Sequence, residues 1–257
     1  MRFSVLASSS KGNATVISGG NTHLLVDTGI SATRIRKGLQ ECGLSVAQLT
    51  GILYTHEHTD HVCGLGQLAK KDKLTVYCTR YMAQELRYVT GSPNYTYIEP
   101  GSTVQVGDIL VTPFSTSHDA TDPVGYLFEY EGKKLGYITD TGMIPRKVPK
   151  LLQGVQALYL ESNYDPEMLR NSGRPYHLIE RIASNFGHLS NAQAGDFVRH
   201  IAHDKLQHLV LAHLSQDCNT PEIAFNSMQQ TLTELQLPTN LYCAPAAYRL
   251  PWIHIEL

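Results

Sequence analysis

Residues 53–61 read LYTHEHTDH, in which an apolar run leads into a turn that carries four groups able to bind a metal. These groups are the imidazoles of His56, His58 and His61 and the carboxylate of Asp60. Imidazole nitrogen and carboxylate oxygen are ligands for zinc, manganese, iron and cobalt. Because side chains alternate along a strand, His56 and His58 project to one side. Asp60 and His61 lie beyond the turn, so the stretch predicts a metal centre that can face two ions.

The overall composition is that of an ordinary globular protein, with 257 residues, 42% of them hydrophobic and 17% charged. This length suits one large domain or two small ones, and we expect a single domain over residues 1–257. The formal net charge of −2 provides no general basic field that would attract nucleic acid. A local basic patch remains compatible with that charge, because only the surface distribution matters.

Cysteine use and the first residues bear on location. The five cysteines have irregular spacings without a CxxC pair, which indicates free thiols in a reducing compartment. The opening MRFSVLASSS lacks the layout of a signal peptide, and no apolar run approaches the roughly 20 residues of a membrane helix. We therefore expect a cytoplasmic protein without membrane contact. Cys63 and Cys218 lie near predicted ligands in sequence, and we expect them to pack as small hydrophobic residues.

Short β-rich runs alternate with helical stretches along the chain. Strands are predicted at residues 3–6, 14–17, 23–27, 51–54, 75–78, 102–106, 109–114, 124–130, 134–139, 157–160 and 209–212. Helices are predicted at residues 31–41, 64–71, 79–88, 174–184, 191–203 and 221–236. Ser190 and Gln193 form a capping box before the fifth helix, and Asn21 and Gly132 mark hairpin turns. Two groups of strands, each with helices, predict two mixed sheets packed face to face with helices outside.

The HxHxDH pattern of residues 56–61 resembles the signature motif of the metallo-β-lactamase superfamily, and further motifs of that family find matches. The matching residues are Asp27 in LLVDTG, His118 in PFSTSH, Asp140 in GYITDTG and His213 in LVLAHLS. Their order and their positions at strand ends fit the family across nearly the whole chain. The resemblance implies an α/β fold of the αββα type, a four-layer sandwich.

The same resemblance implies two divalent metal ions per chain, of zinc, manganese or iron. The first site would consist of His56, His58 and His118, and the second of Asp60, His61 and His213. Asp140 would bridge both ions. Asp27 would not bind a metal itself but would hold the loop of residues 56–61, which carries the ligands, in position. Two cations lower the pKa of bound water, so a hydroxide bridging them would be the nucleophile.

Two further segments resemble the phosphodiesterase branch, which includes the tRNA 3′-end processing nuclease and the cyclic phosphodiesterase of phosphonate breakdown. LYLESNYD, residues 158–165, ends a strand at Glu161, and GHLS, residues 187–190, precedes a capped helix. In the tRNA enzyme a glutamate after a strand works with a histidine, and Glu161 and His188 stand at matching places. Such a histidine would protonate the leaving alkoxide while the carboxylate orients it. We expect Asp60, Glu161 and His188 to be catalytic.

The opening segment LASSSKGNAT, residues 6–15, forms a small polar loop whose backbone could approach an anion. We expect phosphate to contact residues of this loop and of the later cap: Ser8, Ser9, Ser10, Gly12, Asn13 and Ser190. Together with HTDH, GHLSNAQAG and LAHLSQDCN, the loop resembles the YycJ/WalJ subfamily, which implies 5′-to-3′ exodeoxyribonuclease activity on DNA. The interval from Asp140 to His213 is too short for a β-CASP insertion, and no long exosite arm is present.

Other functions remain open at this point. A small-molecule cyclic or nucleotide phosphodiesterase shares this core, and the net charge of −2 favours it. A thioester or lactone hydrolase would need no pair of His188 and Glu161. A catalytically silent nucleic-acid-binding or scaffold protein would be free to lose ligands, which this chain keeps. A di-iron, oxygen-reducing enzyme of this fold usually replaces one histidine by an acidic residue, whereas His58 is retained. The sequence indicates no obligate protein partner.

Overall fold

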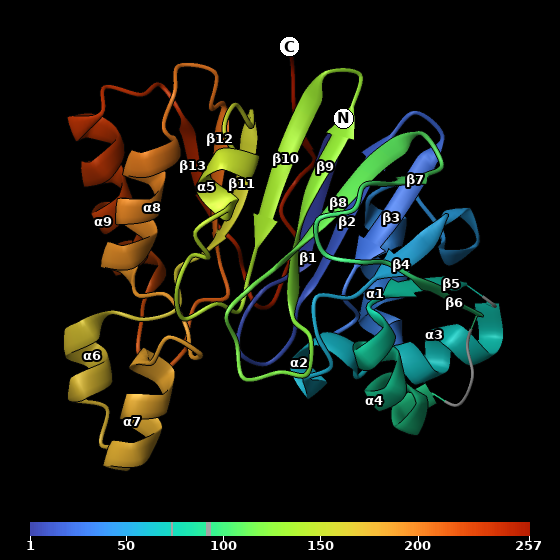
Figure 1. Ribbon diagram of the computed structural model, residues 1–257, viewed down its shortest axis with the longest axis horizontal. Helices are drawn as coiled ribbons and strands as arrows, with labels where there is room; N and C mark the ends of the chain where they lie inside the picture. The colour runs from blue at the N-terminus through green and yellow to red at the C-terminus, as the bar shows by residue number, and fades with distance from the viewer. Residues whose placement is uncertain (73, 91–93) are drawn as a thin grey trace.

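Two mixed β-sheets of seven strands each lie face to face at the centre of the fold (Figure 1). The structure is a computed structural model that describes residues 1–72, 74–90 and 94–257. The first sheet has the order β14-β1-β2-β3-β4-β5-β6. Its strands are β1 (Arg2–Ala7), β2 (Ala14–Gly19), β3 (Thr22–Val26), β4 (Gly51–Leu53), β5 (Thr75–Cys78), β6 (Asn94–Tyr97) and β14 (Ile253–His254). The second sheet has the order β13-β12-β11-β10-β9-β8-β7. Its strands are β7 (Val104–Val106), β8 (Ile109–Ser115), β9 (Val124–Tyr130), β10 (Lys133–Ile138), β11 (Ala157–Glu161), β12 (His208–Ala212) and β13 (Asn240–Cys243).

Helices cover the outer faces of both sheets (Figure 1). Helices α1 (Ala32–Glu41), α3 (Leu65–Asp72) and α4 (Arg80–Thr90) lie against the first sheet. Helices α8 (Asn191–Ile201) and α9 (Pro221–Glu234) lie against the second. The remaining helical segments of the described residues are η1 (Val46–Gln48), α2 (Thr59–Val62), α5 (Val148–Leu151), α6 (Pro166–Arg170) and α7 (Tyr176–Ala183). The αββα four-layer sandwich expected from the sequence is confirmed.

Both sheets follow the same plan, in which one half is antiparallel and the other half is parallel. In the first sheet β14, β1, β2 and β3 pair antiparallel, and β3 to β6 pair parallel. In the second, β7 to β10 pair antiparallel, and β10 to β13 pair parallel. The carboxyl ends of parallel strands meet at one edge of a sheet, which is where open α/β sheets bind ligands. The loops that follow β3, β4, β10, β11 and β12 therefore gather at one end of the sandwich.

The layer between the sheets contains four fully buried tyrosines, Tyr54, Tyr126, Tyr137 and Tyr159. The rings of Tyr137 and Tyr159 stack with their centroids 4.1 Å apart. Each hydroxyl has a polar partner: Thr28 for Tyr54, the Tyr54 carbonyl for Tyr126, Thr15 for Tyr137 and Ser8 for Tyr159. Buried tyrosine hydroxyls need such partners, so polar residues from the loop after β1, from β2 and from the loop after β3 are fixed between the sheets.

Every strand and helix predicted from the sequence has a counterpart, and the local signals also hold. The Ser190–Gln193 capping box is present. Glu131 and Gly132 both have positive φ between β9 and β10, as a two-residue hairpin turn requires. The sequence missed β6, β13, β14, α2, α5 and α6. These are edge strands of four residues or fewer and helices of four or five residues, which are too short to show a period.

Two further expectations concern cysteines and membrane spans. All five cysteines are free. Cys218 is buried as expected, whereas the expectation for Cys63 is wrong because this residue ends α2 and is exposed. Among the helices of the described residues, none has the length and apolar character needed to cross a membrane.

Backbone contacts hold the turn after β4 against the loop after β3. Thr28 N–H donates to the His61 carbonyl at 2.7 Å, and Asn13 N–H donates to the Asp60 carbonyl at 2.9 Å. A Cβ atom on Gly29 would lie only 1.5 Å from that Asp60 carbonyl oxygen. The glycine of LLVDTG is therefore required for the close approach that positions Asp60 and His61.

We expect Gly29→Ala to lower the free energy of unfolding by about 1–3 kcal/mol or more, because the added methyl group meets rigid backbone. Urea unfolding of the purified variant measures this loss. Gly38→Ala is the matched control, since its Cβ would meet only the flexible side chain of Leu6, at 3.2 Å, inside α1. Equal stability of the Gly29 variant and the native chain would contradict the assigned contact.

Candidate metal centre

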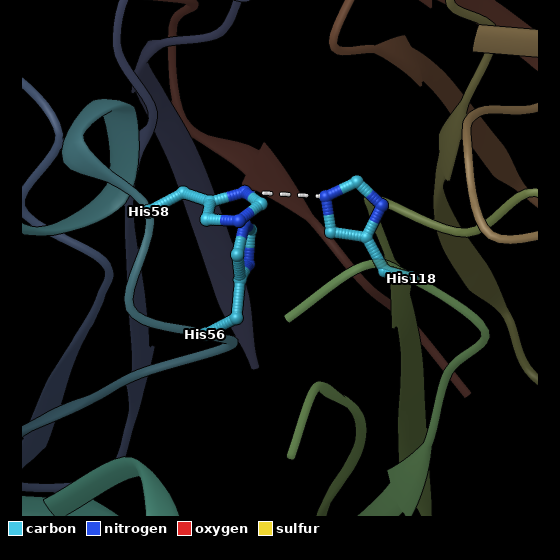
Figure 2. Close-up of side chains that lie close together, drawn as sticks. All are labelled: His56, His58 and His118. Atoms are coloured by element: carbon cyan, nitrogen blue, oxygen red, sulfur yellow. Dashed lines mark hydrogen bonds between the residues drawn. The ribbon is translucent and has the colours of Figure 1, made fainter. Parts of the chain in front are cut away.

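Three histidine rings from two loops converge at the first cluster. His56 and His58 follow β4, and His118 follows β8. Figure 2 shows the His58 ring facing His118, and the His58 Nδ1 and His118 Nε2 atoms are 3.3 Å apart. His56 Nε2 is buried and has no hydrogen-bond partner among the described residues. A buried imidazole nitrogen without a partner carries a desolvation cost, which a bound cation would offset. The position of His56 Nε2 therefore suits a metal ligand.

The second cluster consists of Asp60, His61 and His213, which come from α2 and from the end of β12. The Asp60 Oδ2 atom lies 3.5 Å from His61 Nε2 and 3.4 Å from His213 Nε2. Three donor atoms thus surround one point, from residues far apart in sequence. Nitrogen and oxygen donors of this kind suit zinc, manganese or iron.

Asp140 lies between the two clusters. Its Oδ2 atom is 3.2 Å from His61 Nε2, and its Oδ1 atom is 3.7 Å from His118 Nε2. The carboxylate is almost fully buried, and Thr139 donates a hydrogen bond to it at 2.7 Å. The Oδ1 atom also lies 3.5 Å from His213 Nδ1, so the carboxylate contacts members of both clusters, a position that suits a ligand shared by two cations.

Four of the converging histidines form a hydrogen bond through Nδ1, on the side of the ring opposite to Nε2. The partners are Thr55 Oγ1 for His56, Asp27 Oδ2 for His61, the Gly187 carbonyl for His118 and Glu161 Oε1 for His213, at 2.8–3.1 Å. Metal-binding histidines usually donate their second ring N–H in this way, which fixes the ring and its tautomer. The Nε2 atoms of these four rings are thereby left for the centre.

Asp27 occupies the position behind the metal loop that the sequence predicts. It is fully buried, receives hydrogen bonds from the Thr55 N–H and hydroxyl at 2.9 Å each, and lies 2.8 Å from His61 Nδ1. Burial raises the pKa of Asp27, although His61 and Thr55 act against that shift. One carboxylate therefore ties the loop after β3 to the strand end of β4 and to the His61 ring.

The charges in the centre depend on one another. Burial lowers the pKa of His61, but Asp140 and Asp27 outweigh it and hold that pKa well above its ordinary value. Burial also lowers the pKa of His213, but Asp140, Asp60 and Glu161 act more strongly in the opposite direction and raise this pKa to about 10. Burial and the neighbouring His61 instead place the pKa of His56 well below the ordinary value. A cation would take the place of the imidazolium protons, since a ligating imidazole is neutral.

Three of these residues adopt left-handed backbone conformations, with φ of 60° at Asp27, 50° at Asp140 and 54° at His213. Such angles are uncommon outside glycine and cost roughly 1–3 kcal/mol each. Asp27 and His213 directly follow β3 and β12, and Asp140 lies two residues after β10. The sharp backbone turn at each strand end directs the side chain into the centre, so local strain is concentrated where the clusters meet.

The structure brings Glu161 and His188 together beside the metal clusters. Glu161 Oε1 lies 2.8 Å from His188 Nδ1, and Oε2 accepts hydrogen bonds from the Thr141 and Leu189 N–H groups. Burial opposes ionisation of Glu161, but His188 outweighs it and lowers the pKa of Glu161. The same Oε1 atom also lies 2.9 Å from His213 Nδ1, a contact that the sequence did not predict.

Most residues of the predicted phosphate loop are buried and hold the site together. The Ser8 hydroxyl accepts a hydrogen bond from the His213 N–H at 2.8 Å, and Ser190 caps α8. Asn13 Nδ2 lies 3.1 Å from His61 Nε2. Ser9, Gly12 and Asn13 are buried, whereas Ser10 is exposed. Because their side chains are enclosed, we do not propose Ser8, Ser9 and Ser190 as phosphate ligands.

Sequence reasoning missed Asp119, which follows His118 directly. Its Oδ1 atom lies 3.4 Å from His118 Nε2, and its Oδ2 atom accepts a hydrogen bond from Arg181 Nε at 2.6 Å. The adjacency of His118 and Asp119 was the available signal. The link to Arg181 in α7 could not be found without the fold, because 62 positions separate the two residues.

We expect Asp27→Asn to weaken metal binding by roughly 10–100-fold, the usual effect of losing a carboxylate behind a ligating histidine. Asparagine keeps the shape but removes the charge that faces His61. Competition with a chromogenic chelator measures the affinity, and Asp204→Asn, an exposed site, serves as the control. Unchanged affinity in the Asp27 variant would show that this carboxylate does not support the metal loop.

Comparison with known proteins agrees with this geometry. The profile of the β-lactamase superfamily domain matches residues 22–214. The chain is 38% identical over 237 residues to exodeoxyribonuclease YycJ of Bacillus anthracis, covering 91% of this chain and 90% of the relative. It is 33% identical over 242 residues to exodeoxyribonuclease WalJ of Streptococcus pneumoniae, covering 92% and 90%.

A solved structure shares the fold over nearly the whole chain. The metallo-β-lactamase fold protein YhfI of Bacillus subtilis superposes with a TM-score of 0.74 at 15% identity, covering 97% of this chain and 99% of that protein. The family profile spans most of the chain, including the loop after β4 and His213. This chain is a metal-dependent hydrolase of the β-lactamase superfamily and belongs to the family that contains YycJ and WalJ.

Proposed function

We propose that the protein is a 5′-to-3′ exodeoxyribonuclease that works with two divalent metal ions. The observation that carries the proposal is the Glu161–His188 pair, which lies directly beside two clusters of metal-binding side chains. The names of the relatives, both exodeoxyribonucleases, support DNA as the substrate. The five free cysteines suit the cytoplasm as the proposed location.

The ligand sets that fit two ions are those expected from the sequence. The first would be held by His56, His58 and His118, the second by Asp60, His61 and His213, with Asp140 shared. The unpartnered Nε2 of His56 and the Nδ1 hydrogen bonds behind four rings support this assignment. When bound, such a pair of cations activates water and neutralises charge on a phosphodiester. Zinc, manganese and iron all suit the donor set.

The chain's own residues supply the proton for the leaving group. His188 Nδ1 is engaged by Glu161, which leaves Nε2 to face a substrate, and the His188 side chain is 20% exposed. As an oxygen from water forms a bond to phosphorus, the bond from phosphorus to the 3′ oxygen breaks. The Nε2 proton moves to that 3′ oxygen. The products are a nucleotide with a 3′ hydroxyl and a shortened strand with a 5′ phosphate.

This pair favours phosphodiester over thioester chemistry. An alkoxide is a poor leaving group unless it is protonated, whereas a thiolate leaves without a proton donor. Glu161 is fully buried and receives hydrogen bonds on both oxygens, so it holds His188 in one orientation. A site for thioesters would have no use for that arrangement.

A small-molecule cyclic or nucleotide phosphodiesterase is the second candidate, because the formal net charge is −2. Hydrolysis of end-labelled DNA beside a cyclic nucleotide and a thioester, with Mn²⁺ or Zn²⁺, separates the two candidates. Release of mononucleotides from the 5′ end supports the exonuclease. Cleavage of the cyclic nucleotide alone would support the second candidate instead.

We expect the native protein to contain up to two divalent ions per chain after reconstitution and Asp140→Ala to lose at least one of them. A carboxylate that faces both clusters is hard to replace, so activity should fall with the metal content. Elemental analysis beside the nuclease assay measures both quantities, with Asp204→Ala as an exposed control. Two ions and full activity in the Asp140 variant would rule out the shared position.

We expect His188→Ala to keep its metals and still bind DNA but to slow the chemical step by roughly 10²–10⁴-fold. A bis-nitrophenyl phosphate has a good leaving group that needs no proton, so its hydrolysis should fall far less. Single-turnover rates on both substrates measure the difference. His200→Ala, at an exposed position of α8, is the control. Equal losses on both substrates would mean that His188 only positions the substrate.

A further inference from the structure

A hollow of about 290 Å³ has His188 in its wall. Its wall includes Ser10 and Lys11 from the loop after β1, Arg174 and Arg181 from the α7 region, and Asp217 from the loop after β12. Three segments far apart in sequence therefore enclose one space that shares His188 with the candidate active site. Of the predicted phosphate-binding residues, Ser10 alone lines this hollow.

The hollow is positively charged although the chain carries a net charge of −2. Lys11, Arg174 and Arg181 bring three cations to its wall. Arg174 pairs with Asp217 at 2.7 Å and Arg181 pairs with Asp119, so one positive charge remains in excess. That charge is the Lys11 ammonium, which is exposed and forms no ion pair with any residue in the described ranges.

The paired guanidinium groups still offer donors to a ligand. Each guanidinium has five N–H donors in a planar fork, and one carboxylate uses at most two of them. The Arg174 side chain is 29% exposed and that of Arg181 is 58% exposed, so the remaining N–H groups are accessible. A phosphate monoester, with its charge near −2 and three terminal oxygens, matches such a set of cations.

One wall of the hollow touches the candidate metal centre. Arg181 holds Asp119, and Asp119 Oδ1 lies 3.4 Å from His118 Nε2. His188 forms part of the wall and also lies beside the centre, with its ring 5.1 Å from that of His118 and 5.2 Å from that of His213. A phosphodiester at the centre would therefore have the hollow on the side of its leaving oxygen.

We propose that this hollow binds the 5′-terminal phosphate of the DNA strand through Lys11 and Arg174. The proposal rests on the proposed function, in which His188 protonates the leaving 3′ oxygen. That oxygen belongs to the 5′-terminal nucleotide. This nucleotide therefore lies next to His188, and its own 5′ phosphate points towards Lys11 and Arg174 in the hollow. The walls from α7 and the loop after β12 limit the space, which selects a strand end and explains digestion from the 5′ terminus.

The test uses the metal-loaded protein and 3′-labelled oligonucleotides that differ only in a 5′ phosphate or a 5′ hydroxyl. We expect kcat/KM to be at least about tenfold higher for the phosphorylated end, as one charge-assisted contact provides. Lys11→Ala and Arg174→Ala should each reduce this ratio by roughly tenfold, mainly through KM. Arg170→Ala, an exposed cation on α6 that does not line the hollow, should leave the ratio unchanged.

A binding measurement separates the pocket from the proposed activity. Isothermal titration calorimetry with thymidine 5′-monophosphate should show binding that Lys11→Ala and Arg174→Ala weaken, and thymidine 3′-monophosphate should bind less well. Equal rates on both DNA ends, or nucleotide binding that neither variant weakens, would overturn the pocket assignment. If only the bis-nitrophenyl ester is hydrolysed and DNA is not, the exonuclease function fails, and the calorimetry still decides whether the hollow binds a 5′ phosphate.

Discussion

The arrangement of this protein depends on the burial of ionisable groups where two sheets meet. Asp27 and Glu161 are fully buried and Asp140 is almost so, and together with Asp60 they face a set of enclosed imidazoles. A buried charge without a partner costs several kcal/mol, so each carboxylate must be paired. The hydrogen bonds from Thr55 to Asp27, and from Thr141 and Leu189 to Glu161, offset that cost. The left-handed residues at the strand ends and the close contact of Gly29 with Asp60 also fix the paired carboxylates and imidazoles in place.

Glu161 links two parts of the site that sequence analysis treats as separate. Its Oε1 atom lies within 2.9 Å of Nδ1 on both His188 and His213, one a candidate proton donor and the other a candidate metal ligand. The loop that carries His213 is also held by Ser8, whose hydroxyl contacts the buried Tyr159. The layer of tyrosines between the sheets therefore reaches the loop of His213 through Ser8.

Sequence reasoning predicted the parts of this structure that depend on short patterns. HxHxDH, the LLVDTG aspartate, Asp140 and His213 could be proposed from the sequence because each lies within a few residues of the end of a buried strand, where a local motif is visible. The paired position of Glu161 and His188 came from a resemblance between segments. Strand order and the contact of Glu161 with His213 could not be predicted, because both depend on pairing across long sequence intervals, and the edge strands β6, β13 and β14 are too short to show a period. The meeting of Lys11, Arg174 and Arg181 could not be predicted either, because Lys11 lies in the opening segment, the two arginines belong to no motif, and the three come together only in the folded chain.

The fold and the specificity of the site come from different segments. The strands of both sheets supply the candidate metal ligands, and similar strand ends occur in a superfamily with many activities, so they do not select a substrate. The chain between β11 and α8 adds α6 and α7, which lie beside the sandwich rather than on the face of a sheet (Figure 1). No residue of α7 is fully buried, and the helix packs through the partly buried Ile179 and Ile182 on a small cluster of Tyr164, Leu169 and Cys218. It carries Arg181, follows Arg174 and leads to His188, and these three residues line the charged hollow. The proposed binding of DNA by a chain of net negative charge rests on this local excess of positive charge, because the field near the site matters for binding more than the total charge.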